Sequence, residues 1–125
     1  MGLARAVRVL RFAFWLPLAM LLAQCTTSRS VWLAREGWRA EARGAPAQAA
    51  SLYELAAASD SRQVAARLNA IRLRAQTPEG REDAQKALDV LLKEQPSEPR
   101  VAAFAATWAL WQGDVGLARE RLARS

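Results

Sequence analysis

Residues 44–56 read GAPAQAASLYELA, and their spacing returns twice further along the chain. Residues 79–91 read EGREDAQKALDVL, and residues 113–122 read GDVGLARERL. In each stretch a small residue is followed four positions later by a large one: Ala49 and Tyr53, Ala84 and Leu88, Ala118 and Leu122. Successive stretches are offset by 35 and 34 residues, and a period near 34 predicts repeated pairs of helices.

The spacing has a physical reason. Gly44 and Gly113 suit the end of a first helix, because glycine enters the left-handed conformation at little cost. Five residues later an alanine allows a second helix to pass close to the first, and four residues further a large side chain fills the groove between them. Gly37 fits a small position on the first helix, and Pro96 fits the end of a repeat.

These motifs resemble the tetratricopeptide repeat over about residues 30–125. The resemblance implies an all-α fold, a short right-handed solenoid of about three antiparallel helix pairs preceded by a signal-peptide helix. Arg72 stands where the second repeat of that family has a small residue, and Ser61 stands where the first has proline. An unrelated small helical bundle is the alternative; it explains the apolar stripes but not the recurrence near 34 residues.

Apolar periodicity and helix-start signals give the expected helices. Pro46 suits a first turn, Thr77 a cap before Pro78, and Asp114 a cap after Gly113. Ser97 suits a cap before the proline that follows it by two residues. The predicted helices span 31–43, 46–59, 62–75, 78–94, 99–112 and 115–124. Trp32, Trp108 and Trp111 are expected mainly in helix contacts, with Trp111 the best candidate for an exposed aromatic.

The first 24 residues have the three zones of an export signal. Residues 1–11 carry Arg5, Arg8 and Arg11 without an acid, and residues 12–23 are continuously apolar. A helix of 12 residues is about 18 Å long, well short of the ~30 Å hydrocarbon core of a bilayer. A short apolar run between a basic and a polar segment predicts a signal peptide.

Leu22, Ala23 and Cys25 resemble the lipobox of bacterial lipoproteins, although Gln24 departs from the Gly, Ala or Ser that this family prefers before the cysteine. The resemblance implies that the Cys25 sulfur is lipidated and anchors the chain in a membrane, facing the periplasm, with the outer membrane favoured over the inner by Thr26. The expected organisation is a signal peptide over 1–24, a polar linker over 25–30 and the repeat domain over 31–125.

Three other interpretations of this segment stay open. The segment could remain as an uncleaved inner-membrane anchor, with its arginines extending the span. It could be cleaved after Ala23 by an ordinary signal peptidase. It could also be a buried first helix of a cytosolic protein.

Composition argues against catalysis. The chain contains no histidine and one cysteine, which excludes Ser–His and Cys–His nucleophiles, histidine metal sites and internal disulfides. From Cys25 onward 15 basic residues face 12 acidic ones, without the basic stripe that nucleic-acid binding requires. We therefore expect a non-enzyme without cofactor, metal or nucleic-acid partner.

A binding surface is the remaining expectation. Carried over from the repeat family, a partner-binding groove would be formed by six residues in particular: Trp38, Glu41, Asn69, Leu73, Arg100 and Thr107. This mixture suits a protein or peptide partner. The resemblance implies a lipid-anchored interaction scaffold or assembly factor for pilus, secretion or polysaccharide-export machinery. The alternatives are a self-associating envelope lipoprotein, closed by an apolar face around Trp108, Leu117 and Leu122, and a signal-anchored protein with helices on the bilayer.

Overall fold

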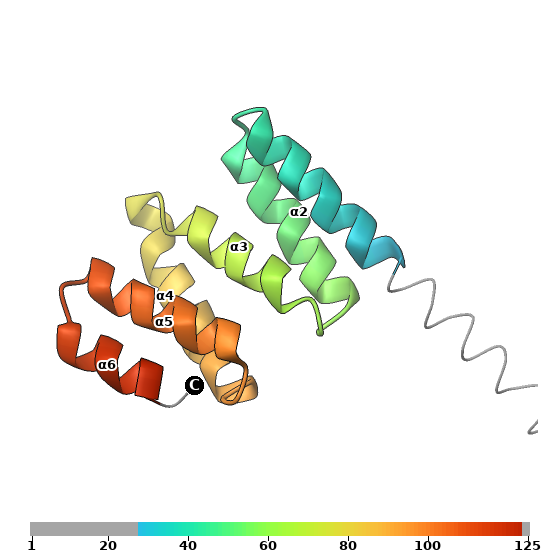
Figure 1. The fold of residues 1–125 in the computed structure, drawn as a ribbon. Coiled ribbons are helices and arrows are strands. Elements are labelled where there is room, and N and C mark those ends of the chain that lie inside the picture. The colour runs from blue at the N-terminus through green and yellow to red at the C-terminus, as the bar shows by residue number, and fades with distance from the viewer. Residues whose placement is uncertain (1–27, 124–125) are drawn as a thin grey trace, which may run out of the picture.

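The computed structural model describes residues 28–123, and this part of the chain is all-helical, without a strand (Figure 1). The predicted all-α class is confirmed. No helix within this range is long and apolar enough to cross a membrane. The predicted signal peptide and Cys25 lie outside the described residues. The helices are one over residues 28–42, α2 (Pro46–Ser59), α3 (Val64–Arg74), α4 (Pro78–Glu94), α5 (Pro99–Trp111) and α6 (Val115–Ala123).

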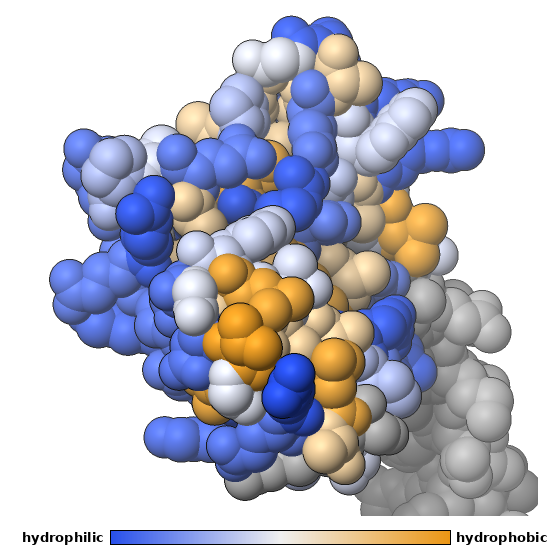
Figure 2. Space-filling view, turned by 60° about the vertical axis from the view of Figure 1, so that its left-hand side comes forward, coloured by the Kyte–Doolittle hydropathy of each residue, from blue (hydrophilic) through white to orange (hydrophobic). Residues whose placement is uncertain are grey.

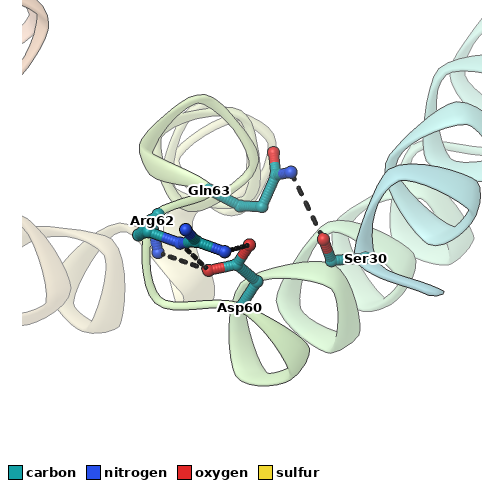
Figure 3. Close-up of polar contacts among 4 residues, drawn as sticks. All are labelled: Ser30, Asp60, Arg62 and Gln63. Carbon is teal, nitrogen blue, oxygen red and sulfur yellow. Dashed lines mark hydrogen bonds and ion pairs between the residues drawn. The ribbon is translucent and has the colours of Figure 1, made fainter. Parts of the chain in front are cut away.

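The helix over 28–42 includes residues 28–30, which the sequence assigned to the polar linker. Ser30 is fully buried, and its hydroxyl oxygen accepts a hydrogen bond of 3.3 Å from Nε2 of Gln63, at the start of α3 (Figure 3). Beside it, Asp60 accepts hydrogen bonds from the backbone N–H and the guanidinium of Arg62. Tertiary contact therefore holds this end of the helix, which the polar character of residues 26–30 did not reveal.

The turns inside the first and third helix pairs use glycine as expected. Gly44 has a φ of +75° and Gly113 a φ of +81°, the left-handed conformation that other residues enter at a cost. Asp114 then caps α6, because its Oδ1 accepts a hydrogen bond of 2.8 Å from the N–H of Leu117. These two turns confirm the helix-ending role predicted for the two glycines.

The turn between α3 and α4 is different. The hydroxyl of Thr77 accepts a hydrogen bond of 3.1 Å from the N–H of Gly80, so Thr77 caps α4 as predicted. Gly80 itself lies inside α4, and a Cβ there would collide with the carbonyl oxygen of Arg74. Glycine is needed at this turn for close backbone approach and not for a left-handed conformation. Ser97 does not cap α5; that place is taken by Glu98, whose carboxylate accepts from the N–H of Arg100.

Successive helices pack on one another. α2 packs on α3, α3 on α4 and α5 on α6, and α5 also contacts both α3 and α4. In Figure 1 the 28–42 helix lies alongside α2, and α6 lies at the opposite end of the molecule. Ion pairs tie the elements together across their surfaces: Glu54 of α2 pairs with Arg74 of α3, and Arg67 of α3 pairs with Glu94 at the end of α4.

The core forms two clusters of buried side chains. The first centres on Tyr53, between the 28–42 helix, α2 and α3, and the second centres on Leu88 and Leu91, between α3, α4 and α5. The small residues of the repeat, Ala49, Ala84 and Ala118, are all buried, as their role in close helix contact predicts. The large residue of the third repeat, Leu122, is exposed, because no other described helix covers that face of α6.

The tryptophans divide between core and surface. Trp108 is buried, as predicted, while Trp32 is 58% exposed, which corrects its assignment to helix contacts. Trp111 is 63% exposed, in line with its position off the main stripe of α5, and Trp38 is 65% exposed. Three large aromatic side chains are therefore exposed to solvent, two on the 28–42 helix and one at the end of α5.

Candidate functional site

A cleft of about 670 Å³ opens between the C-terminal ends of α3 and α5 and the start of α4. Two arginines and two tryptophans give it its character, and two glutamines add amide groups. Its lining consists of Arg72, Ala75, Gln76, Arg81, Trp108, Trp111 and Gln112. The lining carries two cations and no carboxylate, so the cleft is suited to an anionic or aromatic group of a binding partner.

The wall of this cleft on the α3 side is held by a polar network. Nη2 of Arg72 lies 2.7 Å from Oε1 of Glu41, which joins α3 to the 28–42 helix. The hydroxyl of Tyr53 donates a hydrogen bond of 3.4 Å to Oε2 of the same carboxylate. Burial, followed by the charge of Glu41, raises the pKa of Tyr53 above its ordinary value, so the phenol stays protonated and remains a donor.

The α4 side of the cleft is formed by Arg81. Arg81 is exposed at the start of α4 and has no acidic side chain within ion-pair distance among residues 28–123. Arg72, by contrast, already forms an ion pair with Glu41. An incoming carboxylate would therefore gain most at Arg81, where it displaces only water.

On the α5 side an aromatic row leads into the cleft. Phe104, Trp108 and Trp111 follow one another along the helix, with ring centroids 6.1 Å apart at each step. The indole N–H of Trp108 donates to Oε1 of Gln85, which also accepts a bond of 3.0 Å from Nε2 of Gln112. Trp108 is thereby fixed as a floor, and the exposed ring of Trp111 forms an apolar wall.

The structure places the sequence-predicted groove residues partly elsewhere. Leu73 is buried in the first core cluster and offers little exposed surface to a partner, and its place in a partner-binding groove stays a prediction. Glu41 is half-buried and reaches the cleft through Arg72. Arg100 is exposed at the start of α5, where it pairs with Glu98 at 2.6 Å.

Three further predicted residues lie on the surface without joining the cleft. Trp38 is exposed on the 28–42 helix, and Asn69 is half-buried on α3. Thr107 is exposed on α5, and its hydroxyl donates a hydrogen bond of 3.0 Å to the carbonyl of Ala103. The cleft residues Arg72 and Trp111 follow Asn69 and Thr107 by three and four positions, one helical turn further on the same faces. Asn69 and Thr107 therefore lie one helical turn away from the cleft.

A second groove of about 410 Å³ lies between α2, α3 and α4. Its apolar lining comes from Ala57, Ala70, Ile71, Ala87 and Val90, and charged residues of both signs surround it. The Glu54–Arg74 pair crosses it, with a second bond of 2.8 Å between Nη2 and Oε2 that helps to raise the pKa of Arg74. Its three cations already have acidic partners, since Arg74 pairs with Glu54, Arg67 with Glu94 and Lys86 with Glu82. This groove therefore offers less to an anionic partner than the first.

The α5–α6 end carries an apolar surface. Leu110, Val115 and Leu122 are each about half exposed, and so is Trp111, which follows Leu110 in α5. Figure 2 shows hydrophobic side chains, in orange, gathered at one place on this part of the molecule and surrounded by hydrophilic ones. Trp108 does not belong to this surface, contrary to the expectation of an end face around it, because it is buried against α4.

The described residues contain no group of three His, Cys, Asp or Glu side chains that could hold a metal ion. No protein-family model matches the chain, and no curated protein or solved structure matches it.

Proposed function

We propose that this chain is a lipid-anchored, tetratricopeptide-like scaffold of the bacterial cell envelope that binds a protein segment in the cleft between α3, α4 and α5. The observation that carries the proposal is this cleft, because it combines an uncommitted Arg81 with an exposed Trp111 on a rigid helical frame. Aromatic and arginine side chains contribute most strongly to protein interfaces. The proposal includes no catalytic step.

Two features support the repeat architecture. The alanines that recur at intervals of 35 and 34 residues are all buried at helix contacts. Two of the three predicted turns, at Gly44 and Gly113, have the left-handed glycine that ends the first helix of a pair. Each helix packs mainly on its neighbours in sequence, as in repeat proteins that expose an extended binding surface.

The anchor rests on the sequence of residues 1–25. A basic start, a short apolar run and Leu22-Ala23-Gln24-Cys25 support export followed by lipidation of Cys25, with the repeat domain held at the periplasmic face of a membrane. Metabolic labelling with radioactive palmitate tests this in the producing cell. Label on the wild type that is lost in Cys25→Ala supports the anchor, whereas an unlabelled wild type or labelled Cys25→Ala excludes it.

The cleft is tested by site-specific photocrosslinking. A photoreactive amino acid in place of Gln76, which lines the cleft, should capture one protein partner in cells, and Arg81→Ala with Trp111→Ala should abolish that capture. The matched control is Trp38→Ala with Arg100→Ala, which removes one tryptophan and one arginine from outside the cleft. Capture that survives the first pair and is lost with the second would move the binding surface to the groove expected from sequence.

Self-association is the second candidate function, and the half-exposed Leu110, Val115 and Leu122 favour it. Apolar surface at the end of a helical repeat is normally covered by another helix or a polar cap. Sedimentation equilibrium of the detergent-solubilised chain distinguishes the two candidates. A monomer at tens of micromolar excludes self-association, and a dimer that Leu110→Lys dissociates supports it.

A further inference from the structure

The exposed face of the 28–42 helix has a composition that the cleft does not explain. Positions 28, 29, 31, 32, 35, 38, 39, 42 and 43 are exposed, and at about 100° per residue they cover about 180° of the helix circumference. Leu33, Gly37 and Ala40 point the opposite way, into the core. The exposed side carries three large apolar or aromatic side chains and four cations: Val31, Trp32, Trp38, Arg29, Arg35, Arg39 and Arg43.

The acids of this helix do not neutralise that face. Glu36 lies at its edge, half-buried, and pairs with Arg39 at 2.5 Å. Glu41 turns toward Arg72 and Tyr53 on the neighbouring helices. Arg29, Arg35 and Arg43 have no acidic partner among the described residues, so the exposed side has a net positive charge.

We infer that this face lies on the surface of the membrane that holds the chain's N-terminal anchor, with Trp32 and Trp38 at the level of the lipid headgroups and the arginines on anionic phosphates. Tryptophan prefers the membrane interface, and arginine extends its charged end toward headgroups. A face that carries arginines and tryptophans together can bind anionic headgroups and the membrane interface at the same time. The inference rests on the membrane anchor of the proposed function.

The short segment between Cys25 and the 28–42 helix favours the membrane over other binding partners for this face. Ser28 follows Cys25 by three positions, and a fully extended chain spans at most about 3.6 Å per residue, so the helix starts within about 11 Å of the anchor. A lipid anchor at Cys25 therefore brings this face to a very high effective concentration at the bilayer surface. α6 lies at the opposite end of the molecule from the 28–42 helix, so the α6 end remains clear of the membrane (Figure 1).

Fluorescence quenching by brominated lipids tests the inference. The full chain, extracted from the membranes of the producing cell, is reconstituted in vesicles of phosphatidylethanolamine and phosphatidylglycerol that carry bromine near the headgroup end of the acyl chains. Trp32→Phe with Trp38→Phe should remove a quenched component of the wild-type emission. The matched control is Trp111→Phe, which changes a tryptophan of similar exposure at the far end and should leave that component intact.

A charge variant tests the role of anionic lipid. Arg35→Gln with Arg43→Gln should weaken the binding of the 28–42 helix to the vesicle surface. The ratio of molecules with this helix on the surface to molecules with it off the surface should fall about fivefold for each arginine removed, because each contributes about 1 kcal/mol near an anionic surface. Vesicles of phosphatidylcholine alone should abolish the difference between this variant and wild type. Far-UV circular dichroism verifies that all variants keep their helices.

The outcomes separate this inference from the anchor. A chain that floats with the vesicles while the double tryptophan variant is quenched as strongly as wild type overturns the surface assignment and leaves the anchor standing. A chain that does not float with vesicles and carries no acyl group by mass spectrometry contradicts the anchor itself. Quenching that Trp111→Phe removes would place the α5 end on the membrane and also overturn the inference.

Discussion

Nη2 of Arg72 lies 2.7 Å from Oε1 of Glu41, and this ion pair joins α3 to the 28–42 helix at the edge of the cleft. The pair is partly buried, with about a third of each side chain exposed, and Tyr53 donates to the same carboxylate. Glu41 belongs to the proposed membrane-facing helix, and Arg72 lines the proposed binding cleft. Their ion pair therefore links the two surfaces.

A double-mutant cycle should find about 1 kcal/mol of coupling between Glu41 and Arg72, measured as the free energy of unfolding in urea for Glu41→Ala, Arg72→Ala and the double variant. The value lies at the upper end for surface pairs because water is partly excluded. The control cycle uses Glu82 and Lys86, an exposed pair one helical turn apart on α4, which should yield a smaller coupling than Glu41 and Arg72. Equal coupling in both cycles would mean that the Glu41–Arg72 pair has no special role.

Alkaline pH should destabilise the chain through Tyr53. Burial and the neighbouring Glu41 raise the pKa of this phenol above its ordinary value of 10.0. A raised folded-state pKa contributes stability that is complete below the unfolded pKa and is lost as pH rises through the folded pKa. The free energy of unfolding should therefore fall above about pH 10 more steeply in wild type than in Tyr53→Phe.

The titration itself is directly observable, because Tyr53 is the chain's only tyrosine. Tyrosinate absorbance in the near ultraviolet should report a higher midpoint for the folded chain than for the chain unfolded in urea. Identical midpoints in the two states would contradict the arrangement of Tyr53 beside Glu41.

The helices could be predicted from sequence because their ends carry local signals. Thr77-Pro78 and Gly113-Asp114 specify where a helix begins or ends through hydrogen bonds and conformations within a few residues. The buried alanines followed from the recurrence of their spacing. The exposure of Trp32 did not follow, since whether a side chain at a given helical position is covered depends on which neighbouring helix reaches it.

The cleft was harder to predict for the same reason. It is formed by residues from three helices, and Arg72, Arg81 and Trp111 come together only through the way α3, α4 and α5 cross. Arg72 was identified in the sequence as a departure from the repeat pattern, where a small residue was expected. That departure was the signal: the large side chain is tolerated because it lies at the surface and pairs with Glu41.

Replacing the left-handed glycines should destabilise the chain. Gly44→Ala and Gly113→Ala should each lower the free energy of unfolding by about 1 kcal/mol, because a Cβ is disfavoured at φ values of +75° and +81°. No neighbouring atom would contact the new Cβ within 4 Å at either site, so the cost comes from the backbone alone.

The control for these variants is Gly116→Ala within α6. Its Cβ would lie 3.5 Å from Oδ1 of Asp114, an ordinary contact, and alanine favours helix over glycine by about 0.5–1 kcal/mol. Thermal or urea unfolding should thus show opposite signs for Gly113→Ala and Gly116→Ala. Stabilisation by all three substitutions would contradict the left-handed turns.

Gly37 provides the sharpest test of the packing between the 28–42 helix and α2. A Cβ at this position would lie 2.9 Å from Cε1 and 3.0 Å from Cδ1 of Tyr53, closer than side chains normally approach. The ring is held in place by the core around it and by its hydrogen bond to Glu41, so it cannot move aside freely. Gly37→Val should therefore lower the free energy of unfolding by about 1–3 kcal/mol, the usual cost of overpacking. Ala42→Val is the control, since it adds a branched residue at an exposed position of the same helix, where the cost should stay below about 1 kcal/mol. If both variants unfold at the same urea concentration, the 28–42 helix does not pass Tyr53 at the distance seen here. The ion pair between Glu41 and Arg72, which depends on the same packing, would then not link the membrane-facing helix to the cleft.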